Sequence, residues 1–207
     1  MEKKCRFCNI IKKQMSEYGI VDTPFLENEK FFSLVSIGAF ICGWTLLISN
    51  EHMYNFHGFY SNTEFYNYLL RHINLLRDRL HWDKRVIVFE HGANSCNSLV
   101  ACDTSHAHLH IIPWEGSILE EIMSEHTWQC VKWREVSALV ENQEYWLYCE
   151  NPETGVDADV YIHIIDEPES QYFRRVIAEK IGLVGEYSYK KDLRLNQSVK
   201  IRNILEG

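Results

Sequence analysis

The sequence lacks any long apolar run, and this absence excludes one class of protein. No segment approaches the ~18 consecutive apolar residues with which a helix crosses a bilayer. The opening stretch, MEKKCRFCNIIKK, is charged and carries no apolar core of the kind found in a signal peptide. We therefore expect a cytoplasmic protein with no membrane partner.

Basic residues are also in short supply. Lys and Arg together number 21 against 29 for Asp and Glu, which gives a net charge of -8. A negative balance disfavours loose binding to a nucleic-acid polymer or an anionic lipid surface. A small anionic ligand held by a local site remains compatible with this composition.

Proline is scarce, and nothing in the chain reads as a linker. The four prolines mark turns, and no repeat, low-complexity tract or Pro/Gly/Ser-rich stretch separates the elements. Apolar residues make up 46% of the chain and aromatic residues 13%, which is enough for a sizeable core. The seven cysteines are an odd number without dense spacing, so most are expected to be reduced thiols. Cys5 and Cys8, spaced C-x-x-C, are the exception.

Hydrophobic periodicity predicts an α+β fold. A strand is expected to start at Gly43, and further strands are expected at 85–90, 106–112, 145–150 and 158–165. Helices are predicted at 5–18, 117–125 and 169–182, and most securely from a capping box at Ser61-x-x-Glu64 to Leu80. Strands separated by tight turns favour a mainly antiparallel sheet with flanking helices and a helical C-terminal extension.

Three histidines alternate along the predicted strand at 106–112. His106, His108 and His110 share one face because side chains alternate across a strand. Three interpretations remain open at this point: a half-buried strand that happens to carry histidines, a zinc site formed by all three, or a nucleophile with two helpers. The polar loop at 91–105 that precedes the strand favours a functional role.

The run His-Ala-His-Leu-His-Ile-Ile resembles the signature of the histidine triad (HIT) superfamily of nucleotide hydrolases and transferases. The similarity extends over GWTLLISNEH (43–52) and FEHG (89–92), and the SQYFRR segment resembles a longer bacterial, diadenosine tetraphosphate hydrolase-like branch. The resemblance implies a HIT-like catalytic core at 1–115, with an α+β extension at 116–207 packed on it. It also implies a homodimer formed by joining sheets.

The resemblance further implies the chemistry. His108 would attack the α-phosphate of a nucleotide and form a covalent nucleotidyl-histidine intermediate, with His110 stabilising charge and His106 completing the triad. Dinucleoside polyphosphates, nucleoside phosphoramidates and nucleotide sugars are the expected substrates. Members of the superfamily that bind zinc imply a structural zinc site here at Cys5, Cys8, His52 and His106, although two unmetallated cysteines remain an alternative.

Substrate-binding residues are harder to assign because the chain departs from the family pattern. Ser36 stands where the family places a ribose-binding Asp or Asn, and Ala101 to Ser105 replaces a Gly-Gln-Ser/Thr segment that contacts phosphate. The expected substrate-binding residues are Ser36, Asn97, Thr104, Ser105, Gln171 and Arg174. The arginine-bearing helix could equally be a solvated face. The base is expected in an apolar slot near Phe25, Leu26 and Phe32.

Two rival functions follow from the same residues. A metal-dependent hydrolase would use all three histidines as zinc ligands to activate water. A nucleotide-binding regulator with little turnover would explain the unusual Ser36 and Asp103.

Overall fold

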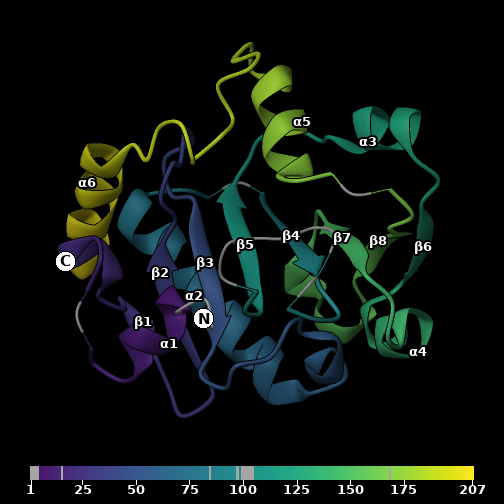
Figure 1. Cartoon of the computed structure of the whole chain (residues 1–207), viewed down its shortest axis with the longest axis horizontal. Helices are drawn as coiled ribbons and strands as arrows, with labels where there is room; N and C mark the ends of the chain where they lie inside the picture. Colours follow the sequence, from purple (N-terminus) through teal and green to yellow (C-terminus); the bar gives the residue numbers. More distant parts are fainter. Residues whose placement is uncertain (1–4, 15, 84, 97, 99–104, 168) are drawn as a thin grey trace.

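The computed structural model describes residues 5–14, 16–83, 85–96, 98, 105–167 and 169–207. Within these residues a single eight-stranded antiparallel sheet runs through the molecule in the order β1-β2-β3-β5-β4-β7-β8-β6 (Figure 1). The strands are β1 (Leu26–Glu27), β2 (Phe31–Val35), β3 (Thr45–Ser49), β4 (Val86–Gly92), β5 (His108–Pro113), β6 (Gln129–Lys132), β7 (Tyr145–Cys149) and β8 (Asp159–Ile164). The predicted α+β class with a mainly antiparallel sheet is therefore confirmed.

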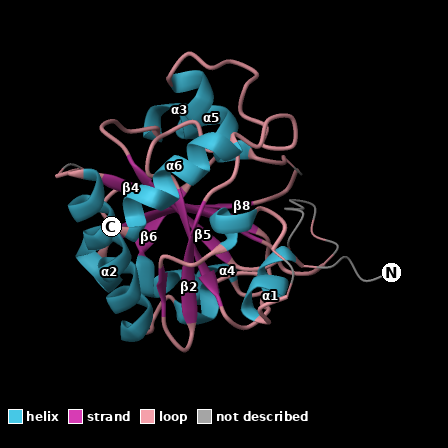
Figure 2. Ribbon diagram, turned by 90° about the vertical axis from the view of Figure 1, so that its left-hand side faces the viewer, coloured by secondary structure: helices cyan, strands magenta, loops and turns pink. Residues whose placement is uncertain are grey.

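Helices flank the sheet on both faces. The α-helices are α1 (Arg6–Ile11), α2 (Thr63–Leu80), α3 (Leu119–Glu125), α4 (Val136–Val140), α5 (Tyr172–Lys180) and α6 (Leu195–Glu206). Short 3-10 turns are η1 (Gly19–Asp22), η2 (His57–Phe59), η3 (Trp133–Glu135) and η4 (Pro152–Asp157). Figure 2 shows α1 and α2 on opposite sides of the strands. Among the described residues, no helix combines the length and apolarity needed to cross a membrane.

The alternation of side chains along the strands divides the core into two layers. Leu47, Leu109 and Leu147 face α2 and join the larger core, which also takes in Ile201 and Leu205 of α6. The neighbouring residues on the strands face the other way. There they form one cluster under α5, around Phe89 and Trp146, and a second under α1, around Phe7 and Ile48. The histidine strand lies between these two clusters.

The sequence located most elements but not all of their ends. Helix α2 starts at Thr63 rather than at the predicted capping box, because Asn62 is its N-cap and accepts from the Glu64 backbone N–H at 2.8 Å. The N-terminal helix expected at 5–18 ends at Ile11. Strand β6 and helix α4 were not predicted; β6 is an edge strand of four residues with exposed and half-buried positions and little apolar pattern.

The two segments expected from the resemblance, 1–115 and 116–207, both contribute strands to the same sheet. Strand β7 pairs with β4 in the register Val88↔Cys149 to Gly92↔Tyr145. Both edges of β4 are therefore occupied, one by β5 and one by β7. Sheet joining in a homodimer would have to use one of the two short edge strands, β1 or β6.

Candidate active site and metal centre

Strand β5 holds His108 and His110 on the face that lies under α1 and α5. It pairs with β3 on one side, where Leu46 is opposite His110, and with β4 on the other, where Phe89 is opposite His110. His106 lies just before the strand. The backbone of the next residue, Ala107, is held by hydrogen bonds from its N–H to the Met53 carbonyl and from the Ser49 N–H to its carbonyl. The triad therefore comprises two strand residues and one residue of the preceding turn.

His108 is bound to its own strand through one ring nitrogen. Its Nδ1 donates to the backbone carbonyl of His106 at 2.8 Å. Because a neutral imidazole carries one proton, this bond leaves Nε2 with a free lone pair. Burial lowers the pKa of His108, and Phe7 of α1 packs edge-on against the ring with centroids 5.6 Å apart. The lowered pKa favours the neutral ring, and the residue as a whole is half-buried.

His110 has a different set of neighbours. Trp44 donates its Nε1–H to the Nδ1 of His110 at 2.9 Å, and Phe89 stacks on the imidazole with ring centroids 4.4 Å apart and an interplanar angle of 17°. Burial holds the pKa of His110 well below its usual value, and the neighbouring His108 adds to the effect. The rings of His108 and His110 lie 5.1 Å apart.

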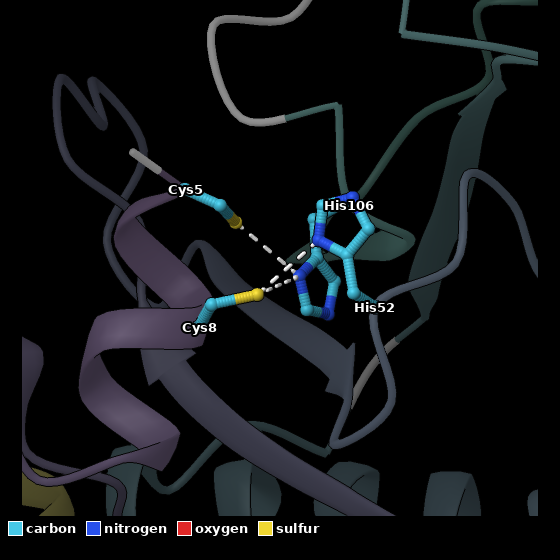
Figure 3. A group of neighbouring side chains, drawn as sticks. All are labelled: Cys5, Cys8, His52 and His106. Atoms are coloured by element: carbon cyan, nitrogen blue, oxygen red, sulfur yellow. Dashed lines mark hydrogen bonds between the residues drawn. The ribbon is translucent and has the colours of Figure 1, made fainter. Parts of the chain in front are cut away.

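His106 turns away from this pair toward the N-terminus. Its Nε2 lies 2.8 Å from the Ser49 carbonyl, so Nε2 carries the proton and Nδ1 presents its lone pair. That Nδ1 is 3.4 Å from Cys5 Sγ and 3.6 Å from Cys8 Sγ, and His52 Nδ1 is 3.2 Å from Cys8 Sγ (Figure 3). The ligand atoms of all four residues lie within 4.8 Å of one another.

These four residues fit a tetrahedral metal ion. Zinc bonds of about 2.3 Å to sulfur and about 2.0 Å to nitrogen place two such ligands about 3.5 Å apart, close to the distances found here. Two thiols side by side in a half-buried site are unfavourable as thiolates without a cation, and burial together with Cys5 raises the pKa of Cys8 to about 11. The Ser49 carbonyl supplies the outer hydrogen bond that metal-binding histidines usually make.

The remaining predicted binding residues lie in different surroundings. Ser36 is buried, and its hydroxyl donates to the Ile37 carbonyl at 3.2 Å. Ser105 is half-buried and adopts a positive φ of 38° just before the triad. Gln171 contacts Ser188 and the Tyr189 backbone at the start of α5. Asn97 and Thr104 lie outside the described residues.

Arg174 is a buried cation beside the triad. Its Nε donates to the Tyr187 carbonyl at 2.9 Å and its Nη2 donates to the Gly38 carbonyl. The guanidinium lies 4.6 Å from the centroid of the Trp44 ring. Arg174 therefore joins the C-terminal segment to the loop before β3 and places a positive charge behind His110.

A buried apolar cluster lies next to the triad on the α1 side. It consists of Phe7, Phe32, Leu34, Leu46 and Ile48, with Ile10 and Ile11 packed against it. Ile10, Ile11 and Phe32 also line a cavity of about 530 Å³, whose polar wall includes Asp22 and Asn50. Of the three residues expected at the base slot, Phe32 is here, whereas Phe25 and Leu26 pack against the larger core on the opposite face.

Three aromatic residues that touch the triad, and one further histidine near it, were not predicted as site residues. Trp44 and Phe89 contact His110, Phe7 contacts His106 and His108, and His91 lies two residues after Phe89 on the same face of β4. Burial lowers the pKa of His91 to about 3, and His108 contributes to this shift. For two of them the sequence offered a signal, because Phe89 and His91 are two residues apart and therefore share one face of a strand.

The chain shows only limited similarity to known proteins. No protein-family model and no curated protein matches the chain. A hypothetical histidine triad nucleotide-binding protein from Sulfolobus tokodaii is 24% identical over 55% of this chain and 71% of that chain, with a TM-score of 0.37. A Hit-like protein involved in cell-cycle regulation from Bartonella henselae is 17% identical over 56% and 81%, with a TM-score of 0.39.

A HIT family hydrolase from Clostridium thermocellum is 19% identical over 55% of this chain and 92% of that chain, with a TM-score of 0.37. Identities and TM-scores this low establish neither a function nor a substrate for this chain. Its chemistry has to be inferred from its own side chains.

Proposed function

We propose that this chain is a histidine triad nucleotide hydrolase or nucleotidyltransferase in which His108 attacks the α-phosphorus of a nucleotide. The observation that carries the proposal is the 2.8 Å hydrogen bond from His108 Nδ1 to the carbonyl of His106. This bond fixes the tautomer and the orientation of the ring, and it directs the free lone pair of Nε2 away from the strand backbone.

The same bond explains how the covalent step can proceed in both directions. When Nε2 attacks phosphorus, a P–N bond forms and the bond from phosphorus to the leaving group breaks. His108 keeps its Nδ1 proton throughout, so the nucleotidyl-imidazole is cationic. Attack by water or by inorganic phosphate then breaks the P–N bond and releases a neutral imidazole, which is a good leaving group.

Cys5, Cys8, His52 and His106 would hold a structural zinc ion, as the fit of their donor atoms supports. When bound, the ion supplies a cross-link between the N-terminus, the segment after β3 and the turn before β5. His106 is then fixed by its ring, while its backbone carbonyl orients His108. The metal residues therefore act on the reaction through the position of one carbonyl group.

The surroundings of the triad suit a nucleotide. The cavity lined by Ile10, Ile11 and Phe32 offers an apolar wall for a base on the α1 side of the sheet. On the opposite side, Arg174 contributes positive charge near His110.

The geometry does not favour a zinc hydrolase that uses all three histidines as ligands. His106 directs its Nδ1 toward the two thiols, whereas the Nδ1 atoms of His108 and His110 are engaged by a carbonyl and by an indole N–H. Within the described residues, the group of donor atoms that comes together combines one triad histidine with residues from outside the triad.

Product analysis tests the proposal. The wild-type protein and His108→Ala are incubated with a dinucleoside polyphosphate, a nucleoside phosphoramidate and a nucleotide sugar, with and without inorganic phosphate. We expect the wild type to release a mononucleotide, or a nucleoside diphosphate when phosphate is the acceptor. His108→Ala should lose this activity by a factor of roughly 10³ or more, as expected for loss of a nucleophile.

A matched control separates chemistry from folding. His81→Asn replaces an exposed histidine at the C-cap of α2, where the left-handed conformation suits asparagine, and it should retain full activity. A quenched single-turnover reaction of wild type should show a protein mass increased by one nucleotidyl group. Equal turnover by wild type and His108→Ala would refute the nucleophile, and nucleotide binding without turnover by either would favour the regulator.

A further inference from the structure

A single hydrogen bond determines which ring nitrogen of His110 carries the proton. Trp44 is fully buried, and its Nε1–H donates to His110 Nδ1 at 2.9 Å. An indole nitrogen is only ever a donor, so Nδ1 must present its lone pair to Trp44. The one proton of the neutral His110 ring is therefore on Nε2, the nitrogen on the other side of the ring.

The groups around His110 also oppose a second proton. His108 on β5, His91 on β4 and Arg174 on α5 are the titratable or charged groups that face the ring, and each is neutral or positive. Phe89 covers one face of the imidazole, which removes water from it. A proton on Nδ1 would additionally set an N–H against the indole N–H and break the bond to Trp44.

The indole itself cannot turn away to relieve this conflict. Its ring is held between Phe40, with centroids 5.1 Å apart, and the guanidinium of Arg174 at 4.6 Å. Phe89 packs edge-on against it from β4, with centroids 5.9 Å apart. The donor is therefore fixed in direction as well as in kind.

We propose that Trp44 is a positioning residue that keeps His110 as a neutral Nε2–H donor, and that this specialises the site for phosphoanhydride substrates over nucleoside phosphoramidates. This inference depends on the proposed function of His108. It narrows the substrates to nucleotides whose leaving group is itself a phosphate, such as dinucleoside polyphosphates or nucleotide sugars.

The chemistry of the leaving group is the reason. When His108 Nε2 attacks an anhydride, the P–O bond breaks and the electron pair leaves on a phosphate oxygen. That oxygen is stable as an anion because the relevant phosphate pKa is about 6, so a hydrogen bond from His110 Nε2–H is sufficient. In a phosphoramidate the P–N bond must break, and the amine leaves only after its nitrogen has gained a proton. A neutral His110 keeps its own proton and cannot supply one.

The first experiment compares leaving groups on one nucleotide. Turnover of diadenosine tetraphosphate and of adenosine 5′-phosphoramidate is measured with the wild type, Trp44→Phe and Trp133→Phe. Because general acid catalysis typically contributes 10²–10⁴-fold, the wild type should prefer the anhydride by roughly 100-fold or more. Trp44→Phe frees Nδ1, and the preference should fall about tenfold, the effect of one ordinary hydrogen bond.

Trp133→Phe is the control for lost core volume. Trp133 is as fully buried as Trp44 but packs against Tyr66 on the opposite face of the sheet. Both variants lose the same indole ring, and only Trp44→Phe should change the ratio of the two rates. The ratio does not depend on the fraction of folded protein, so a purely structural role for Trp44 would leave it unchanged.

The second experiment reads the tautomer directly. Two-bond ¹H–¹⁵N spectra of the histidine rings at neutral pH distinguish a protonated Nε2 from a protonated Nδ1, and His110→Asn assigns the signal. We expect Nε2–H in the wild type and a mixture of tautomers in Trp44→Phe. A protonated Nδ1 or an imidazolium in the wild type would overturn the role of Trp44.

The outcomes separate the two proposals. Turnover of the phosphoramidate at a rate equal to or above that of the anhydride, by an active enzyme that depends on His108, overturns the substrate inference alone. Absence of turnover of both compounds and of the nucleotide sugar overturns the proposed function and the substrate inference with it.

Discussion

His106 donates its Nε2–H to the backbone carbonyl of Ser49 at 2.8 Å, and this bond turns its other ring nitrogen toward the cysteines of the N-terminus. The first histidine of the triad is thereby separated from the other two. It belongs to the metal centre by its side chain and to the reaction centre by its carbonyl group.

Loss of the metal centre should therefore cost stability first. We expect about one zinc ion per chain in the purified protein, and we expect Cys8→Ser to lose it and to lower Tm by about 5–10 °C. Metal content by mass spectrometry and thermal unfolding measure the two effects. Cys130→Ser, which changes an exposed cysteine on β6, is the control and should match wild type. Full stability of Cys8→Ser, together with absence of zinc from the wild type, would leave the two thiols without a metal-binding role.

His72 makes stability depend on pH from the opposite face of the sheet. It is buried, with Ser33 Oγ 2.9 Å from Nδ1 and Thr45 Oγ1 2.8 Å from Nε2, and burial lowers its pKa to about 3. The unfolded chain binds a proton at His72 below pH 6.5, whereas the folded chain does so only near pH 3. The stabilisation that the neutral ring gives is therefore complete above pH 6.5 and is lost as pH falls toward 3.

Urea unfolding of wild type and His72→Gln between pH 7.5 and 4.5 tests this dependence. Glutamine does not titrate, so the difference between the two free energies of unfolding should shrink by about 1.4 kcal/mol for each pH unit below 6.5. A difference that stays constant over the whole range would contradict the assignment of a buried neutral His72.

Helix α6 should be part of the core and not a loose tail. Ile201 is 2% exposed and packs in the larger core, whereas Ile204 on the same helix is 43% exposed. We expect Ile201→Ala to lower the free energy of unfolding by about 3 kcal/mol through lost burial and a residual cavity. Ile204→Ala removes the same atoms from an exposed position and should change it by less than about 0.5 kcal/mol. Similar effects in chemical denaturation would mean that α6 is not docked.

The sequence predicted what depends on local pattern. The spacing of Phe65, Leu69 and Ile73 indicated α2, and the alternation of side chains indicated the histidine strand. Both patterns could be recognised because each is contained within one short segment of the sequence. The N-cap was missed because Ser61 and Asn62 are both good capping residues and only the backbone decides between them. Edge strand β6 has no apolar alternation that could reveal it.

Contacts between distant residues depended on register and could not be predicted from pattern. Trp44 and His110 are 66 positions apart in the sequence. They meet only because β3 and β5 pair with Leu46 opposite His110. The grouping of Cys5, Cys8, His52 and His106 was expected from the family resemblance, since no local rule connects a residue at position 5 with one at 106.

The pairing of β4 with β7 also affects how readily an incompletely synthesised chain associates with another copy. Strand β4 and the histidine strand precede Tyr145–Cys149 in the chain and are therefore synthesised before it. During that interval the outer edge of β4 offers unpaired N–H and carbonyl groups next to buried apolar side chains. A nascent or prematurely ended chain that stops before β7 is consequently the form most prone to associate with another copy, and completion of β7 closes that edge.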